Sequence, residues 1–100
     1  MADDLQLARA VSEAALTTKG VYSLGTGRFA EAATYGAGDK VTGVVVRPDE
    51  VKVHIVARYP LAEPIPVLAE RVREQVASRA EGRIATVVVE DLKVMQDEDL

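Results

Sequence analysis

The stretch Val44–Tyr59, VVVRPDEVKVHIVARY, decides the fold, and it completes a predicted β-hairpin that begins at Val41. Its three consecutive valines favour a strand, and Pro48 followed by Asp49 favours a tight turn. After the turn the side chains alternate: one face carries Val51, Val53, Ile55, Ala57 and Tyr59, and the other carries Lys52, His54, Val56 and Arg58. We therefore expect an antiparallel pair with one face in the core and the other in solvent.

Two helices are predicted, one on each side of the hairpin. Leu5–Leu16 has apolar residues at helical spacing, and Asp3 or Asp4 can cap its N-terminus. The second helix covers about 66–81 and ends before Gly82, which suits the left-handed position after a helix. Its apolar stripe consists of Ile65, Leu68, Val72, Val76 and Ala80.

The pattern of Ile84–Val94 predicts a third strand, with Val87 and Val89 directed inward. This strand can lie antiparallel beside the first hairpin strand or parallel beside the second, and both alternatives stay open. The predicted fold class is α+β, in the order helix–strand–strand–helix–strand, with a three-stranded sheet and both helices on one face.

The segment Val21–Lys40 is predicted to be irregular, and it holds four of the seven glycines. Within it we expect a short alanine-rich helix from Phe29 to Tyr35, ended by Gly36. The aromatic side chains of Tyr22, Phe29 and Tyr35 are expected to pin this segment onto the edge of the domain.

Length and composition indicate a single domain, 1–100, with an ordered core of about 5–94 and an acidic C-terminal tail at 96–100. The 100 residues include 12 basic and 16 acidic side chains, a formal net charge of −4. There is no cysteine and one histidine, which excludes a disulfide scaffold, a thiolate metal site, a cysteine nucleophile and a cluster of histidine ligands. Neither a leader peptide nor an apolar run of spanning length is visible, so we expect a cytoplasmic protein with no direct membrane span.

No catalytic, cofactor-binding or metal-binding residues are predicted, and the chain is not expected to be an enzyme. His54 has no evident carboxylate partner, and the adjacent acids Glu90 and Asp91 are expected on opposite faces of a strand. Residues 25–30 formally fit the dinucleotide-binding pattern G-x-G-x-x-A, but that loop must follow a strand, whereas here it follows a helix. These glycines are therefore interpreted as ordinary loop residues.

The candidate partner face consists of Arg47, Lys52, His54 and Arg58, on the side of the sheet away from the helices. It fits either an ordinary solvated sheet face or a docking surface for an acidic partner protein. It lacks exposed aromatic side chains for base stacking, so nucleic acid is disfavoured as a partner. A small nucleic-acid-binding or regulatory module that uses this basic face is kept as the alternative function.

Five motifs occur in a characteristic order along the chain. They are Lys19-Gly20-Val21 after the first helix, the hairpin ending in Tyr59, Pro64-Ile65-Pro66-Val67, the helix VLAERVREQVASRAEG, and the strand Val87-Val88-Val89-Glu90-Asp91-Leu92. In this order they resemble the alkaline shock protein family, envelope-stress response proteins found mainly in Gram-positive bacteria. The resemblance covers roughly Leu5 to Val94, but Pro60 follows the hairpin tyrosine where the family usually has glycine, and the segment 23–40 matches little.

The resemblance implies a function that composition and periodicity do not show. It implies a non-enzymatic protein of the envelope or general stress response that self-associates as a scaffold, as a homo-oligomer or with a paralogue. Family members are abundant cytoplasmic proteins that can lie at the inner membrane face, tethered by a small membrane-anchored partner. The expected location is therefore the cytoplasm, peripheral to that membrane.

Overall fold

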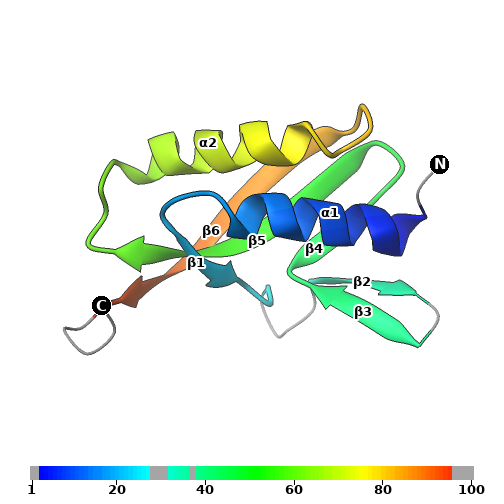
Figure 1. Cartoon of the computed structure of the whole chain (residues 1–100), viewed down its shortest axis with the longest axis horizontal. Helices are drawn as coiled ribbons and strands as arrows, with labels where there is room; N and C mark the ends of the chain where they lie inside the picture. The colour runs from blue at the N-terminus through cyan, green and yellow to red at the C-terminus, as the bar shows by residue number, and fades with distance from the viewer. Residues whose placement is uncertain (1–2, 28–31, 37, 96–100) are drawn as a thin grey trace.

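The computed structural model describes residues 3–27, 32–36 and 38–95 of the chain. It has two helices, α1 (Asp4–Leu16) and α2 (Ile65–Ala77), and a mixed sheet that both helices cover on one face (Figure 1). The sheet contains β1 (Val21–Leu24), β4 (Val44–Val46), β5 (Glu50–Tyr59) and β6 (Ile84–Val94). A separate hairpin of β2 (Ala33–Gly36) and β3 (Asp39–Thr42) lies beside α1. The predicted α+β class and the placement of both helices on one face are confirmed.

Strand β5 is the centre of the main sheet. On one edge it pairs in parallel with β6 along its whole length, Glu50 opposite Ile84 and Tyr59 opposite Val94. On the other edge β4 pairs antiparallel with its first half and β1 with its second half. Of the two topologies left open by the sequence, the parallel one is correct, because α2 carries the chain back over the sheet before β6 begins.

The core lies between the helices and the inner face of β5. Val51, Val53, Ile55 and Ala57 are fully buried, whereas the residues between them are only half-buried, so the predicted alternation is confirmed from Val51 to Ala57. Tyr59, predicted on the same face, is exposed at the end of the strand. From the helices the core receives Leu7, Ala8, Val11, Ala15, Leu68, Val72 and Val76, and the turn after α2 adds Ala80. The stripes expected on both helices therefore face the same layer of side chains.

The ends of the helices follow local rules with one difference from the prediction. Asp3 caps α1, its side chain accepting a hydrogen bond of 2.7 Å from the amide of Gln6. Helix α2 ends at Ala77, four residues earlier than predicted. Turns follow it, and Glu81 (φ 54°) and Gly82 (φ 84°) both adopt left-handed conformations that reverse the chain into β6.

The segment between α1 and β4 differs most from the prediction. The expected helix from Phe29 to Tyr35 is wrong over 33–35, where β2 pairs with β3; residues 29–31 lie outside the described residues. Tertiary contacts override the alanine content, because the buried Thr34 hydroxyl donates a 2.7 Å hydrogen bond to the carbonyl of Val44. The segment also supplies β1, so the main sheet has four strands rather than three.

The aromatic residues of that segment do not pin it to the domain. Tyr22 and Tyr35 are exposed, and Phe29 lies outside the described residues. Small buried residues take this role instead, namely Ala32 and Thr34. The acidic tail predicted at 96–100 also lies outside the described residues.

Gly43 separates the two sheets. The predicted hairpin began at Val41, but 41 and 42 belong to β3, and the chain bends at Gly43, whose φ is 91°. A Cβ atom at this position would lie 2.6 Å from the carbonyl oxygen of Gly25 and 2.8 Å from Cβ of Leu24. Both the backbone conformation and the lack of space therefore require glycine where the chain passes from one sheet to the other.

Candidate functional site

The four residues predicted as a partner face do not gather in one place. Lys52, His54 and Arg58 do share the face of β5 opposite the core, which we call the open face. Lys52 and Arg58 are six residues apart, about 20 Å along an extended strand. Arg47 is exposed in the turn between β4 and β5, where its carbonyl accepts a 2.8 Å hydrogen bond from Nε of Arg83.

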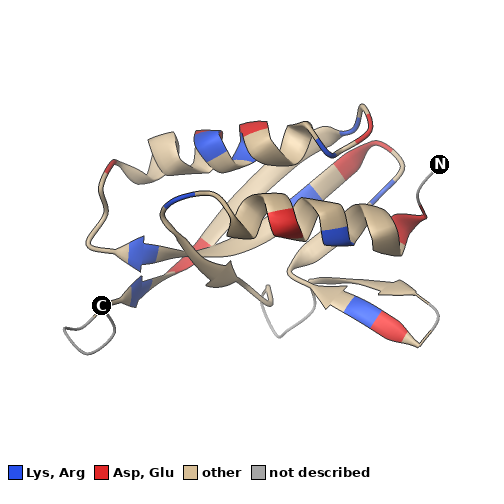
Figure 2. Ribbon diagram, in the orientation of Figure 1, with Lys and Arg blue, Asp and Glu red and all other residues tan. Residues whose placement is uncertain are grey.

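Acidic residues interrupt the basic character of the open face. Figure 2 shows basic and acidic residues interspersed along β5 and β6 rather than one basic patch. Glu50, at the start of β5, accepts a 2.8 Å hydrogen bond from the hydroxyl of Thr86 on β6. The structure therefore places Lys52, His54 and Arg58, but not Arg47, on this face, and the face is not basic overall.

His54 does have a carboxylate neighbour, contrary to the prediction. Its Nδ1 lies 3.7 Å from Oε1 of Glu90 on β6, and the two side chains are 16% and 25% exposed. This Nδ1 atom is buried and has no hydrogen-bond partner among the described residues. The sequence did not indicate the pair because 35 residues separate its members along the chain, and only the parallel register of β5 and β6 brings them together.

A β-bulge sets the direction of the Glu90 side chain. Ile55 pairs with Val89 and Val56 with Asp91, so Glu90 is the extra residue. Its carboxylate accepts a 3.0 Å hydrogen bond from the amide of Gly27. The expectation that Glu90 and Asp91 simply point to opposite faces therefore does not describe this strand.

The loop after β1 packs against Glu90 through a glycine. A Cβ atom on Gly25 would lie 1.6 Å from Oε1 of Glu90, so the carboxylate occupies the space that a side chain would need. The Gly25 amide donates a 2.7 Å hydrogen bond to the carbonyl of His54. Gly27, His54, Val88 and Glu90 line a hollow of about 350 Å³ at this point. The arrangement holds the loop to the sheet, and the histidine and carboxylate on the wall of the hollow could exchange a proton with a bound group.

An aromatic residue with two cations stands at one end of the open face. Tyr22 is 42% exposed, with the guanidinium of Arg58 at 5.5 Å and the ammonium of Lys93 at 5.8 Å from its ring centroid. The prediction that no exposed aromatic accompanies the basic residues is therefore wrong. Tyr22 was assigned to an irregular segment, and its place in β1 beside β5 is what brings it to Arg58.

Strand β6 has a free edge. Within the part of the chain that the structure describes, β5 is its only strand partner, so its other edge presents unpaired backbone groups. Its eleven residues include three large apolar side chains that are well exposed: Ile84 (69%), Leu92 (40%) and Val94 (57%). Sequence analysis predicted the strand but could not show which edge stays free, because the topology was open.

Within the described ranges, neither helix is long and apolar enough to cross a membrane. In residues 3–27, 32–36 and 38–95, no group of three or more potential ligands could hold a metal ion.

Comparisons of the chain with models of known families, with curated proteins and with solved structures give no significant match. The resemblance to the alkaline shock protein family therefore stays a prediction, as do the expectations that the chain is not an enzyme and that it takes part in a stress response.

Proposed function

We infer that this protein is a non-enzymatic, self-associating scaffold whose copies pair through the free edge of β6. The finer parts of the proposal come from the family resemblance: a role in the bacterial envelope or general stress response, and tethering to the inner membrane face by a small membrane-anchored partner.

The observation that carries the proposal is the length and chemistry of the β6 edge. Unpaired edges of this length attract other strands, and monomeric proteins usually shorten, charge or cover them. Here the edge continues for eleven residues and carries exposed Ile84, Leu92 and Val94. A second copy supplies an identical strand, and a two-fold axis makes such an edge complementary to itself.

The charges near the end of β6 favour one register. In an antiparallel pair with Leu92 at the two-fold axis, residues 90–94 at the end of β6 pair between the copies, and Asp91 of each copy lies opposite Lys93 of the other. This register uses Leu92 and Val94 but leaves Ile84 outside the paired part of β6. Asp91 and Lys93 pair with Val56 and Arg58 of β5, so both belong to the open face of the sheet. Opposite charges directly across a strand pair stabilise it, and like charges destabilise it.

The experiment that tests the proposal is sedimentation velocity across a concentration series. We expect a reversible monomer–dimer equilibrium for the natural chain. Asp91→Lys and Lys93→Asp should each weaken it at least tenfold, because like charges then meet, and the double variant should restore it. Lys52→Asp is the matched control. It makes the same charge change as Lys93→Asp, but Lys52 lies on β5, away from the free edge of β6.

Two results would count against the proposal. The first is a natural chain that stays monomeric at the highest concentration measured. The second is a dimer whose dissociation constant none of the charge variants changes. The membrane part is tested separately, by crosslinking in cells followed by identification of the captured protein. Recovery of a small membrane-anchored protein supports tethering, and recovery of none contradicts it.

A nucleic-acid-binding or regulatory module remains the second candidate. The observation that favours it is Tyr22 beside Arg58 and Lys93, because single-stranded RNA binds to aromatic side chains flanked by cations. Fluorescence anisotropy with a single-stranded RNA at two salt concentrations tests it. Binding that weakens with salt, and that Lys52→Glu combined with Arg58→Glu abolishes without unfolding the chain, supports this function. Binding absent at low salt excludes it.

A further inference from the structure

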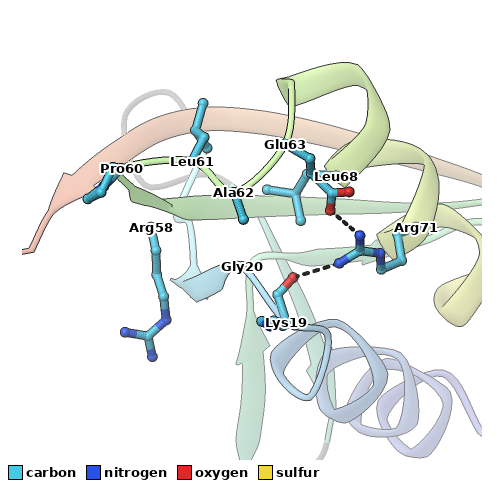
Figure 3. Close-up of a pocket in the computed structure, with 9 residues that line it drawn as sticks. All are labelled: Lys19, Gly20, Arg58, Pro60, Leu61, Ala62, Glu63, Leu68 and Arg71. Atoms are coloured by element: carbon cyan, nitrogen blue, oxygen red, sulfur yellow. Dashed lines mark hydrogen bonds and ion pairs between the residues drawn. The ribbon is translucent and has the colours of Figure 1, made fainter. Parts of the chain in front are cut away.

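A cavity that shares only Arg58 with the open face, and nothing with the β6 edge, lies between the turn after α1, helix α2 and the end of β5. It has a volume of about 270 Å³ (Figure 3). Its walls come from the turn after α1, the end of β5, the loop that leads into α2, and the first turns of α2. The lining residues are Lys19, Gly20, Arg58, Pro60, Leu61, Ala62, Glu63, Leu68 and Arg71.

The inner part of this cavity is apolar. Leu61, Ala62 and Leu68 contribute side chains to it, and Leu68 is almost completely buried. On the opposite wall Gly20 has a φ of 100°, and a Cβ atom there would come within 3.0 Å of Cδ1 of Leu68. Leu68 therefore packs closely against the backbone of Gly20, and together they form an apolar part of the cavity wall.

The rim of the cavity is cationic. Lys19, Arg58 and Arg71 stand against one acid, Glu63, on a chain whose net charge is −4. The Arg71 guanidinium pairs with Glu63 and donates a 3.5 Å hydrogen bond to the carbonyl of Lys19, as the dashed lines in Figure 3 show. These contacts fix Arg71 across the cavity and join the turn after α1 to the loop before α2.

The other two cations, Arg58 and Lys19, differ in whether they already have an interaction partner. Figure 3 shows the Arg58 guanidinium directed away from Arg71. The same guanidinium lies 5.5 Å from the centroid of the Tyr22 ring. Lys19 is exposed, and its ammonium makes no ion pair with any residue that the structure describes. Lys19 is therefore the group that can pair with an incoming charge without giving up an existing partner.

We propose that this cavity binds a small organic anion, a carboxylate on a short apolar body. The apolar part lies on Leu61 and Leu68, and the carboxylate stays at the rim, where it pairs with Lys19. An apolar wall with a few placed polar groups is the usual composition of small-molecule sites. The partly exposed rim keeps the charge near water, so burial of an ion costs little. This proposal is independent of self-association through β6.

The test is a titration of the isotopically labelled full chain with sodium hexanoate at constant ionic strength, followed by amide chemical shifts. We expect saturable shifts at Gly20, Ala62 and Leu68, with a dissociation constant on the order of 1 mM, as suits a ligand of this size. Hexylamine, which has the same apolar body and the opposite charge, should cause no saturable shifts there.

Two variants distinguish an ion pair with Lys19 from nonspecific binding of hexanoate. Lys19→Glu reverses the exposed cation at the rim and should weaken hexanoate binding at least tenfold. Lys52→Glu makes the same change on the open face and should leave it unaltered. The proposal is overturned if hexanoate causes no saturable shifts at these amides, if hexylamine binds equally well, or if Lys19→Glu binds hexanoate as tightly as the natural chain.

Discussion

Replacement of Ile55 by alanine tests which side of β5 faces the core and which side is the open face. Ile55 is fully buried at the centre of β5. The substitution removes three carbon atoms at about 0.8 kcal/mol each, about 2.4 kcal/mol of transfer free energy. The cavity left behind raises the total loss of unfolding free energy to about 3–4 kcal/mol. A chain of this length has a total stability of roughly 5–15 kcal/mol, so the variant should be close to the limit of folding.

Val56→Ala is the matched control, on the same strand but on the open face. Val56 is half-buried, so losing two carbon atoms costs only about 0.8 kcal/mol. The assays are urea unfolding and thermal unfolding, both followed by circular dichroism at a protein concentration low enough to exclude self-association. Thermal midpoints should fall by about 15–25 °C for Ile55→Ala and by about 5 °C for Val56→Ala. Equal losses for the two variants would refute the assignment of an inner and an outer face.

Four further substitutions test local features. Leu68→Asp should unfold the chain, because it places a charge at an almost completely buried position, and a normal thermal melt by circular dichroism would contradict this. Asp3→Ala removes the cap of α1 and should lower the unfolding free energy by about 1 kcal/mol in urea, whereas Asp3→Ser should restore most of it. Gly25→Ala must displace the Glu90 carboxylate, so the loop amide that it holds should exchange with solvent faster, as hydrogen-exchange NMR can measure. The hydrogen bond from Arg73 lowers the pKa of the Glu70 carboxyl, so any stabilisation is present at neutral pH and lost as the pH falls through that lowered pKa. Because the pair lies on the surface, Glu70→Gln should leave the melting temperature unchanged at neutral pH and moderate salt.

Where side chains repeat with a clear period, the sequence was sufficient to predict the element. The alternation through β5 and the helical spacing in both helices give strong signals, and the structure confirms the inner residues such as Val53 and Val72. The bounds of β6 were predicted correctly as Ile84–Val94. These elements bury continuous apolar stripes, so local pattern and tertiary packing favour the same structure.

The segment before β4 could not be predicted because its side chains show no clear period. Strands β1, β2 and β3 have four residues each, too few for a period to appear. What stabilises β2 is not apolar alternation but the buried hydroxyl of Thr34 and pairing with β3. Because these contacts lie outside the alanine-rich stretch itself, a segment that favours a helix locally becomes a strand.

The candidate site was only partly predictable. The residues of the open face followed from the alternation in β5, but its neighbours on β1 and β6 depend on the order of strands. Neither Glu90 beside His54 nor Tyr22 beside Arg58 has any signal in the local sequence. The bulge at Glu90 shifts the register by one residue, and a run of three valines followed by two acids does not indicate where such a shift occurs.

The central position of β5 has a consequence for synthesis on the ribosome. Of the strands that the structure describes, β6 is the last to emerge, yet it covers one whole edge of β5. A nascent chain that has emerged only as far as Gly82 therefore leaves that edge of β5 unpaired, and helix α2 lacks part of the surface on which it packs. Until β6 is made, this edge is open to strands of other chains.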